Sequence, residues 1–298
     1  MNVLDSCPLC NHRPLERMFP DAHDWLMRCP QCRLGFANPQ PTDAELAEIY
    51  HAEYYAQFGY QAGAEAALAR IKQATYAKFL RQAEGLLGPA KALNAKQEKP
   101  RRLLDVGCGL GYSLLAGEQR GWESWGLEPH SMAGKGLPEH LAARIVRGTL
   151  EDFHPPAPLD LVSLIDVIEH VRDPIATVRR AAELLAPGGI LMLATNNAQS
   201  RSARRMGPRW VHFHRAHLWY FSPATLAAVL TQAGLTVRAA RTAWRVYNLQ
   251  YVASILAGGS NFPLARGLAR FSLKAVPRFL RLTSWPPLPE GMLLLASK

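Results

Sequence analysis

Short apolar runs that end in glycine, polar or acidic residues alternate with helical patterns through the middle of the chain. Apolar residues recur at helical spacing from Ala64 to Leu87, with Arg and Lys residues between them. Gly88 and Pro89 end this helix, and the polar, lysine-rich stretch Ala90–Pro100 is predicted to be a linker. A later stretch, Ala186–Gly189, is predicted to be a helix stop and turn. Seven runs are predicted to be strands: Leu103–Val106, Trp125–Leu127, Ala143–Gly148, Leu159–Asp166, Ile190–Thr195, Leu235–Arg241 and Met292–Ala296.

Two further helices are predicted near the end of the chain, at Asn248–Ala257 and Leu264–Leu282. The second mixes apolar residues with five basic ones, and Pro277 is expected to kink or split it. A basic amphipathic segment of this kind can lie on an anionic membrane, or it can pack on its own domain or on a second subunit. Packing is the favoured interpretation, because most amphipathic helices face a core, and peripheral membrane contact through residues 264–282 is the alternative.

The first predicted strand runs into a turn with glycines at every second position, Gly107, Gly109 and Gly111. Glycines spaced in this way let the backbone approach a ligand that a side chain would block. Asp105, just before the turn, can take a positively charged amine or organise the loop. The spacing differs from the dinucleotide-binding fingerprint, and Cys108 inside the turn is predicted to be a packing residue rather than a nucleophile.

Acidic residues lie at or just after the ends of the next three strands. Glu128 follows the second strand, where a carboxylate can accept both hydroxyls of a ribose, as it also does in NAD enzymes. Leu150, Glu151 and Asp152 follow the third strand, and Asp166 ends the fourth. These four motifs, in this order and at these intervals, predict a nucleoside-binding edge of the sheet.

The four motifs together resemble those of class I S-adenosylmethionine (SAM)-dependent methyltransferases. The resemblance implies an α/β fold with a Rossmann-like seven-stranded methyltransferase sheet, whose last strand is antiparallel, and a transferase that uses SAM. It also implies that an acid after the third strand takes the exocyclic amine of adenine. The cofactor-binding residues implied in this way are Asp105, Gly107, Gly109, Gly111, Glu128, Leu150, Glu151, Asp152 and Asp166.

Four of the five cysteines form two Cys-x-x-Cys pairs, Cys7 with Cys10 and Cys29 with Cys32, with 18 residues between the pairs. This spacing predicts a closed four-cysteine Zn²⁺ site with a structural role, and a redox role is disfavoured without a thioredoxin-like context. With the segment that follows, this region resembles the front end of bacterial methyltransferases that carry an amino-terminal zinc ribbon, including sugar and natural-product enzymes. There a helical cover follows the ribbon, and Tyr55 either reaches the cofactor or substrate or packs within the cover.

The expected domains are a zinc ribbon (1–40), a helical cover and linker (41–100), a SAM-binding core (101–242) and a carboxyl-terminal helical insertion with the last strand (243–298). The core contains a loop at 198–221 that is rich in arginine, histidine and aromatic residues. Arginines of this density suit phosphate or carboxylate recognition, and a solvated basic loop is the alternative. The predicted substrate-binding residues are Asn196, Arg205, Arg209, His214, Tyr220 and Tyr55.

Methyl transfer to an oxygen acceptor needs a base, and the candidates are His217, His170 and Asp166. His217 is preferred because the resemblance places its segment near the acceptor, and histidine suits a base near neutral pH. His170 is expected one turn into the helix after the fourth strand, where positioning or packing is the commoner role.

The net charge of +10 favours an anionic partner. The leading prediction is O- or C-methylation of a small or carrier-linked anionic metabolite, such as a nucleotide sugar, a glycan or a natural-product intermediate. The alternative is methylation of ribosomal or transfer RNA with the ribbon as the RNA-binding element, but acidic residues offset the ribbon's few arginines. A cofactor-binding module without catalysis is disfavoured by the intact acids. No apolar run reaches membrane-spanning length and no basic signal-peptide opening is present, so a cytoplasmic location is expected.

Overall fold

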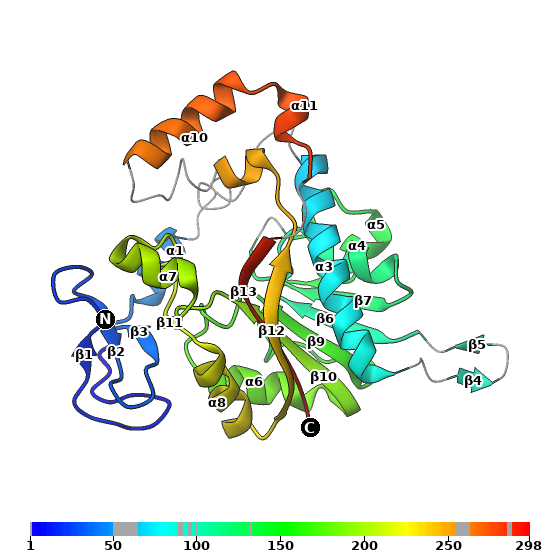
Figure 1. Cartoon of the computed structure of the whole chain (residues 1–298). Helices are drawn as coiled ribbons and strands as arrows, with labels where there is room; N and C mark the ends of the chain where they lie inside the picture. The colour runs from blue at the N-terminus through cyan, green and yellow to red at the C-terminus, as the bar shows by residue number, and fades with distance from the viewer. Residues whose placement is uncertain are drawn as a thin grey trace. The chain divides into compact units, whose positions relative to one another are not determined.

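The computed structural model describes residues 2–49, 65–88, 92–94, 97–98, 100–130, 133–253, 263–284 and 288–298 (Figure 1). The chain forms two compact units, and each is described by itself. The first, the ribbon unit, contains Met1–Ile71, Asn196–Thr225 and Arg245–Pro289. The second, the sheet unit, contains Lys72–Thr195, Leu226–Trp244 and Glu290–Lys298.

A seven-stranded sheet forms the centre of the sheet unit, in the order β12-β13-β10-β9-β6-β7-β8 (Figure 1). The strands from β10 to β8 are parallel to their neighbours, and β13 runs antiparallel to β10. The predicted α/β fold with an antiparallel last strand is therefore confirmed. The strands are β6 (Arg102–Val106), β7 (Glu123–Leu127), β8 (Ile145–Val146), β9 (Leu159–Ile165), β10 (Leu185–Thr195), β12 (Thr236–Arg245) and β13 (Leu288–Ser297).

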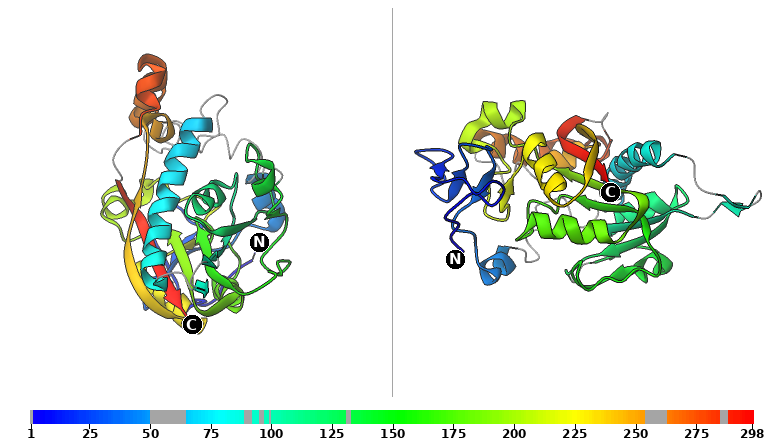
Figure 2. Two further views of the ribbon diagram at one scale, coloured as in Figure 1. Left: turned by 90° about the vertical axis from the view of Figure 1, so that its right-hand side faces the viewer. Right: turned by 90° about the horizontal axis from the view of Figure 1, so that it is seen from below.

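The central strands are nearly continuous apolar runs because helices cover a parallel sheet and leave little of it to solvent. Helix α3 (Glu65–Leu87) lies along the sheet (Figure 2), where Phe79 and Leu80 pack against apolar side chains of β6, β10 and β13. The remaining helices that begin in or extend into this unit are α4 (Tyr112–Glu118), α5 (Glu139–Ala142), α6 (Pro174–Glu183) and α8 (Pro223–Gln232).

Three local predictions for the sheet unit need correction. Within the predicted linker, β4 (Ala92–Asn94) and β5 (Gln97–Glu98) form a hairpin that projects from the unit (Figure 1). The predicted turn at 186–189 lies inside β10, which starts at Leu185 and is irregular between Leu185 and Ile190. Residues 168–170 form a turn, so His170 precedes α6 instead of lying within it. That helix begins at Pro174, because the Asp173 side chain accepts a hydrogen bond from the N–H of Ala176 and proline favours the first helical position.

A four-stranded antiparallel sheet organises the ribbon unit, in the order β1-β2-β3-β11. Its first three strands come from the cysteine-rich start of the chain, and β11 comes from the basic loop after β10. Trp219 of β11 pairs with Phe36 of β3, and Tyr220 pairs with Gly35. A Cβ atom on Gly35 would lie 3.0 Å from the Tyr220 Cβ, so glycine allows this close approach. The strands are β1 (Glu16–Arg17), β2 (Leu26–Arg28), β3 (Gly35–Ala37) and β11 (Trp219–Tyr220).

Short helices complete the described parts of the ribbon unit. Helix α1 (Asp43–Ile49) follows the ribbon, and α7 (Arg201–Met206) and a 3₁₀ turn, η1 (Gly207–Arg209), lie in the basic loop. Near the end of the chain, residues 249–253 are helical, and the rest of the helix predicted there lies outside the described residues. The second predicted helix is split at Pro277, as expected, into α10 (Pro263–Ala275) and α11 (Arg278–Arg281). Among the described residues, no helix has the length and apolarity to cross a membrane.

Candidate functional site

The glycine turn after β6 requires glycine for two separate reasons. Gly107, Gly109 and Gly111 have φ angles of 69°, 55° and 77°, in the left-handed region that side chains disfavour. Space is also lacking: a Cβ on Gly107 would lie 2.4 Å from Val167 Cγ2, and one on Gly111 would lie 2.4 Å from Leu137 Cδ1. The turn is therefore a backbone surface that no larger residue can form without rearrangement.

Asp105 is buried beneath this turn and holds it to its neighbours. Ser113 of α4 donates a hydrogen bond to Oδ2 at 2.5 Å, and Ser163 of β9 donates to Oδ1 at 2.6 Å. Burial raises the pKa of the Asp105 carboxyl to about 6, although the two serine hydroxyls act in the opposite direction. Of the two roles predicted for this residue, these contacts support organisation of the loop.

Glu128, at the end of β7, holds the middle of the same turn. Its Oε2 accepts a hydrogen bond from the N–H of Gly109 at 2.9 Å, and its Oε1 accepts one from the N–H of His130 at 3.0 Å. A carboxylate oxygen has two lone pairs, so each oxygen can accept a further hydrogen bond from a ligand hydroxyl. Glu128 thus fixes the middle of the turn and keeps acceptor capacity at both carboxylate oxygens.

Two further acids lie after neighbouring strands. After β8, Asp152 accepts hydrogen bonds at 3.0 Å from both the N–H and the hydroxyl of Thr149, and these bonds lower the pKa of its carboxyl. Leu150 beside it is buried and Glu151 is exposed. Asp166 follows β9 with a φ of 58°, which non-glycine residues rarely adopt and which is characteristic of functional sites.

The candidate cofactor residues therefore follow the carboxyl ends of four parallel strands, β6, β7, β8 and β9. Ligands of open α/β sheets bind at this edge. A close-approach glycine surface with carboxylates fits the chemistry of SAM, which carries a positive sulfur, an ammonium group and a ribose with two hydroxyls.

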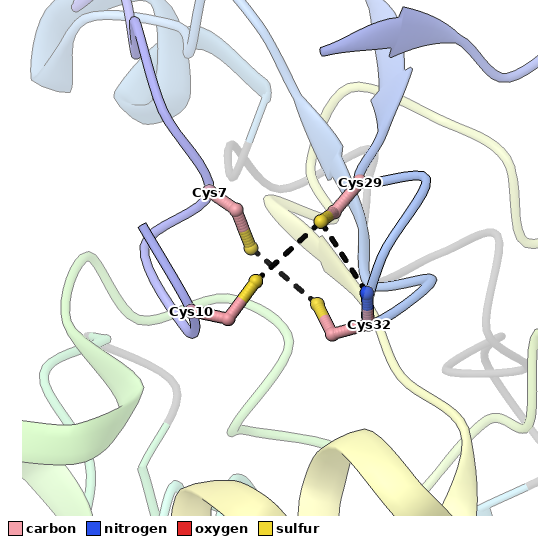
Figure 3. Close-up of side chains that lie close together, drawn as sticks. All are labelled: Cys7, Cys10, Cys29 and Cys32. Carbon is pink, nitrogen blue, oxygen red and sulfur yellow. Dashed lines mark hydrogen bonds between the residues drawn. The ribbon is translucent and has the colours of Figure 1, made fainter. Parts of the chain in front are cut away.

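The four cysteine thiols of the ribbon point toward a common centre (Figure 3). Their sulfur atoms lie within 4.8 Å of one another, with Cys7 Sγ 3.5 Å from Cys32 Sγ and Cys10 Sγ 3.6 Å from Cys29 Sγ. Zinc–sulfur bonds of about 2.3 Å in a tetrahedron place sulfurs about 3.8 Å apart, so the arrangement fits a closed four-thiolate Zn²⁺ site.

Backbone N–H groups in the second knuckle stabilise negative charge on sulfur. The N–H of Cys32 donates to Cys29 Sγ at 3.4 Å. Burial would raise the pKa of Cys29, but hydrogen bonds from backbone groups of Cys32 and Gln31 and from neighbouring thiols lower it to about 7. Burial raises the pKa of Cys32 to about 11 and raises that of Cys7 further. The donor set favours a divalent cation that takes the place of the thiol protons.

His217 lies buried in the ribbon unit, where its orientation is fixed by the backbone. Its Nδ1 lies 3.0 Å from the carbonyl oxygen of His212, and a carbonyl oxygen only accepts hydrogen bonds. Nδ1 therefore carries the proton, and in the neutral ring Nε2 carries the lone pair. His214 packs on the same imidazole, with 3.9 Å between the ring centroids.

The other predicted substrate residues occupy different environments in the ribbon unit. Tyr220 is 3% exposed and its hydroxyl donates to the His214 carbonyl at 2.9 Å, so it belongs to the core of the unit. Arg205 and Arg209 are exposed, whereas Asn196 is half-buried. Tyr55 lies outside the described residues.

Sequence reasoning missed the attachment of the basic loop to the ribbon. An aromatic cluster joins them: the ring of Phe213 lies 5.3 Å from that of Phe19 and 5.1 Å from that of Tyr220. His23 Nε2 lies 2.6 Å from the carbonyl oxygen of Pro208, and the Arg215 guanidinium lies 5.8 Å from the centre of the Trp25 ring. The density of aromatic residues in both segments was the available signal, because such side chains are usually buried together.

Comparison with known proteins gives a consistent picture. The family described as "Methyltransferase domain" matches residues 76–240 of this chain. A protein of Saccharophagus degradans named "Ubiquinone biosynthesis O-methyltransferase" is 28% identical over 201 residues, which cover 56% of this chain and 84% of that protein. A protein of the same name from Rhodopseudomonas palustris is 32% identical over 149 residues, 46% of this chain and 58% of that protein.

A solved structure supports the fold at a greater evolutionary distance. It is the Burkholderia thailandensis 1,6-didemethyltoxoflavin-N1-methyltransferase with bound 1,6-didemethyltoxoflavin and S-adenosylhomocysteine. The two chains are 12% identical, and the match covers 91% of this chain and 98% of the solved chain, with a TM-score of 0.51.

Proposed function

Because this chain belongs to the methyltransferase domain family and is a SAM-dependent enzyme, we propose that it methylates an oxygen or carbon atom of a small or carrier-linked anionic acceptor. When bound, SAM supplies a methyl group made electrophilic by the positively charged sulfur. Gly107, Gly109 and Gly111 present backbone to the cofactor, and Glu128 accepts hydrogen bonds from the ribose hydroxyls while it accepts one from the Gly109 N–H. Asp152 takes the adenine amine, and Asp105 keeps the turn in place through Ser113 and Ser163. Asp166, at the end of β9, is a further cofactor contact.

The main support for deprotonation of an acceptor hydroxyl is the tautomer of His217. With Nδ1–H donated to the His212 carbonyl, Nε2 is the basic atom, which is the arrangement that a general base requires. We assign His217 the removal of a proton from an acceptor hydroxyl. His170 and Asp166, which follow β9, are the alternatives. The name shared by the two relatives, which refers to O-methylation, supports an oxygen acceptor.

The acceptor's charge is inferred from the basic loop. Its five arginines are exposed in the described structure: Arg201, Arg204, Arg205, Arg209 and Arg215. Guanidinium groups bind phosphate and carboxylate through paired hydrogen bonds, so a nucleotide sugar, a phosphorylated glycan or another carrier-linked acid fits this surface. Arg205, Arg209 and His214 are the proposed contacts.

We assign Zn²⁺ to the four cysteines in a structural role. A closed set of four thiolates leaves no coordination position for water or substrate. The ribbon instead supplies strand β3, to which β11 of the basic loop pairs. In this proposal the metal stabilises the loop that carries His217 and the arginines, and the ribbon is not itself a catalytic element.

RNA is the second candidate acceptor, because exposed arginines also bind phosphate backbones. The ribbon offers little support for it: Arg28 is paired with Glu16 at 2.5 Å, and one sheet edge of the ribbon is occupied by β11. Arg13, Arg17 and Arg33 of the ribbon are exposed, so RNA stays the second candidate.

The test is methyl transfer to a cell extract that contains both metabolites and RNA. The zinc-loaded protein is incubated with methyl-labelled SAM, and the label is followed through RNase digestion, organic extraction and chromatography. Label in anionic small molecules or lipid-linked glycans supports the proposal, whereas RNase-sensitive label assigns RNA as the acceptor.

A variant pair tests the base. His217→Ala is expected to lower kcat by about 10²–10⁴-fold while the Kd for SAM stays unchanged. The matched control is His140→Ala, because His140 is an exposed histidine of the sheet unit that is paired with Glu118. An unchanged kcat in His217→Ala would move the assignment to His170 or Asp166.

A further inference from the structure

Exposed apolar side chains gather on α10 and α11. Nine large apolar residues are exposed in the described part of the chain, and five of them fall between positions 264 and 280. The exposed fractions are 76% for Leu264, 60% for Leu268, 68% for Phe271, 72% for Phe279 and 50% for Leu280. Isolated exposed apolar residues are ordinary, but a contiguous group marks an interaction surface.

The spacing of these residues places them on one face of α10. Leu264, Leu268 and Phe271 are separated by four and three positions, so they form a single stripe along the helix. Ala269 projects from a different side of the helix and is 5% exposed, so α10 already packs through another face. The stripe is therefore a second, outward apolar face rather than an inward face that lacks a partner.

The charge of this segment is of one sign. From Pro263 to Leu282 the sequence has five basic residues and no acidic residue. Arg270 and Lys274 are exposed, and at 100° per residue they lie on the flank of the apolar stripe. Long basic side chains beside an apolar stripe can reach anionic groups while the stripe enters an apolar layer.

We propose that α10 and α11 dock the protein on an anionic lipid surface, with the stripe Leu264–Leu268–Phe271 inserted between lipids and the basic flank on the headgroups. The 13 residues of α10 are fewer than the roughly 20 needed to span a bilayer, so the helix lies in the interface. Charge complementarity selects this occupant over a second copy of the chain, because two such helices would bring two sets of five positive charges together. The inference is independent of which acceptor is methylated.

The test is sedimentation of the full-length protein with vesicles of two compositions, phosphatidylcholine alone and equal parts of phosphatidylcholine and phosphatidylglycerol. Binding is expected to the anionic vesicles and to weaken as salt rises, because surface charge attraction is screened. The triple variant Leu264→Ser, Leu268→Ser, Phe271→Ser is expected to lose at least about tenfold in vesicle affinity. Its control is Leu86→Ser with Val146→Ser, two exposed apolar residues elsewhere.

A charge-reversal pair provides a second, independent variant. Arg270→Glu with Lys274→Glu is expected to abolish the preference for anionic vesicles. Arg70→Glu with Arg179→Glu makes the same change in net charge at exposed positions of α3 and α6 and is expected to leave the preference intact. All four variants are also measured for SAM affinity, which is expected to match the parent and shows that they are folded.

Three results would overturn the proposal. The first is equal binding, or no binding, to both vesicle types. The second is anionic binding that the stripe and charge variants do not reduce. The third is a dimer in sedimentation velocity that the stripe variant abolishes without any vesicle binding, which would assign the surface to a second copy.

Discussion

The sheet unit and the ribbon unit each contain a loop with candidate site residues, but the contacts that hold the two loops differ in sequence separation. In the sheet unit, the glycine turn is held by Glu128, 19 positions from the Gly109 N–H that it binds, and by Ser163, 58 positions from Asp105. In the ribbon unit, the histidine loop is held by residues near the start of the chain, as the His23 contact with Pro208 spans 185 positions. The glycine turn therefore belongs to the parallel sheet, whereas the basic loop at 198–221 depends on residues from the start of the chain.

The sheet that joins the start of the chain to the basic loop is small. Strands β1, β2, β3 and β11 contain two or three residues each, which is too few for an independent sheet. Among the described residues, the aromatic cluster around Phe213 and the four cysteines lie beside this small sheet. A structural metal contributes folding free energy directly, so our proposal that the cysteines hold Zn²⁺ predicts that the geometry of the basic loop depends on the metal.

Removal of the metal is expected to produce the largest effect and the clearest separation of the two units. Cys29→Ser, or chelation of the parent protein, should unfold the ribbon unit, because structural zinc contributes on the order of 10 kcal/mol. Methyl transfer should be lost while SAM affinity, measured by calorimetry, stays within about threefold of the parent. Zinc content is measured by mass spectrometry and ribbon folding by the fluorescence of Trp25, Trp210 and Trp219.

The control for zinc content is Cys108→Ser, since this buried cysteine lies in the glycine turn and outside the cysteine cluster. It should keep one zinc per chain. Full methyl transfer by a zinc-free Cys29→Ser protein would contradict the coupling between metal and loop.

A smaller effect is expected from Gly107→Ala. This change should lower SAM affinity and leave the ribbon unit intact, the reverse of metal removal. The left-handed φ of 69° costs about 1–2 kcal/mol for alanine, and the overlap with Val167 costs about 1–3 kcal/mol more. We expect SAM binding to fall at least about tenfold, with the zinc content and the ribbon fluorescence unchanged.

Gly85→Ala is the matched control for this change. Gly85 lies in α3, and a Cβ added there meets no atom of the described structure within 4 Å. Alanine should stabilise the helix by about 0.5–1 kcal/mol and leave SAM affinity unchanged. If Gly107→Ala bound SAM as tightly as the parent, the turn would not be the cofactor surface.

The same difference in range explains what could be predicted from the sequence. The seven-stranded sheet with its antiparallel last strand followed from the family resemblance, and the glycine turn was visible because its motif is local. Glu128 and Asp152 come after β7 and β8, where their local motifs put them, and parallel strands bring such ends to one edge. The pairing of β3 with β11 was not found, because two-residue strands carry no periodicity and nothing local indicates a partner over 180 positions away. The favoured packing of residues 264–282 rested on periodicity, which identifies an apolar face but not what covers it.

The smallest and most selective effect is expected from Ser163→Ala, which removes a hydroxyl from the buried carboxyl of Asp105. Because the folded-state pKa of about 6 lies above the ordinary value of 3.8, the folded protein binds this proton more tightly, and stability falls as pH rises between these values. Above pH 6 the carboxylate is ionised and loses a charge-assisted bond worth about 1.5–3 kcal/mol, whereas near pH 4 a neutral bond worth about 0.5–1.5 kcal/mol is lost. Denaturant unfolding should therefore show a larger loss of stability at pH 8 than near pH 4. The control is Ser124→Ala on β7. The Ser124 hydroxyl is buried and has no hydrogen-bond partner among the described residues. The loss of stability in this variant should therefore be small at both pH values. An equal loss at both pH values would mean that Asp105 is not ionised beneath the turn, and that it organises the loop as a neutral carboxyl.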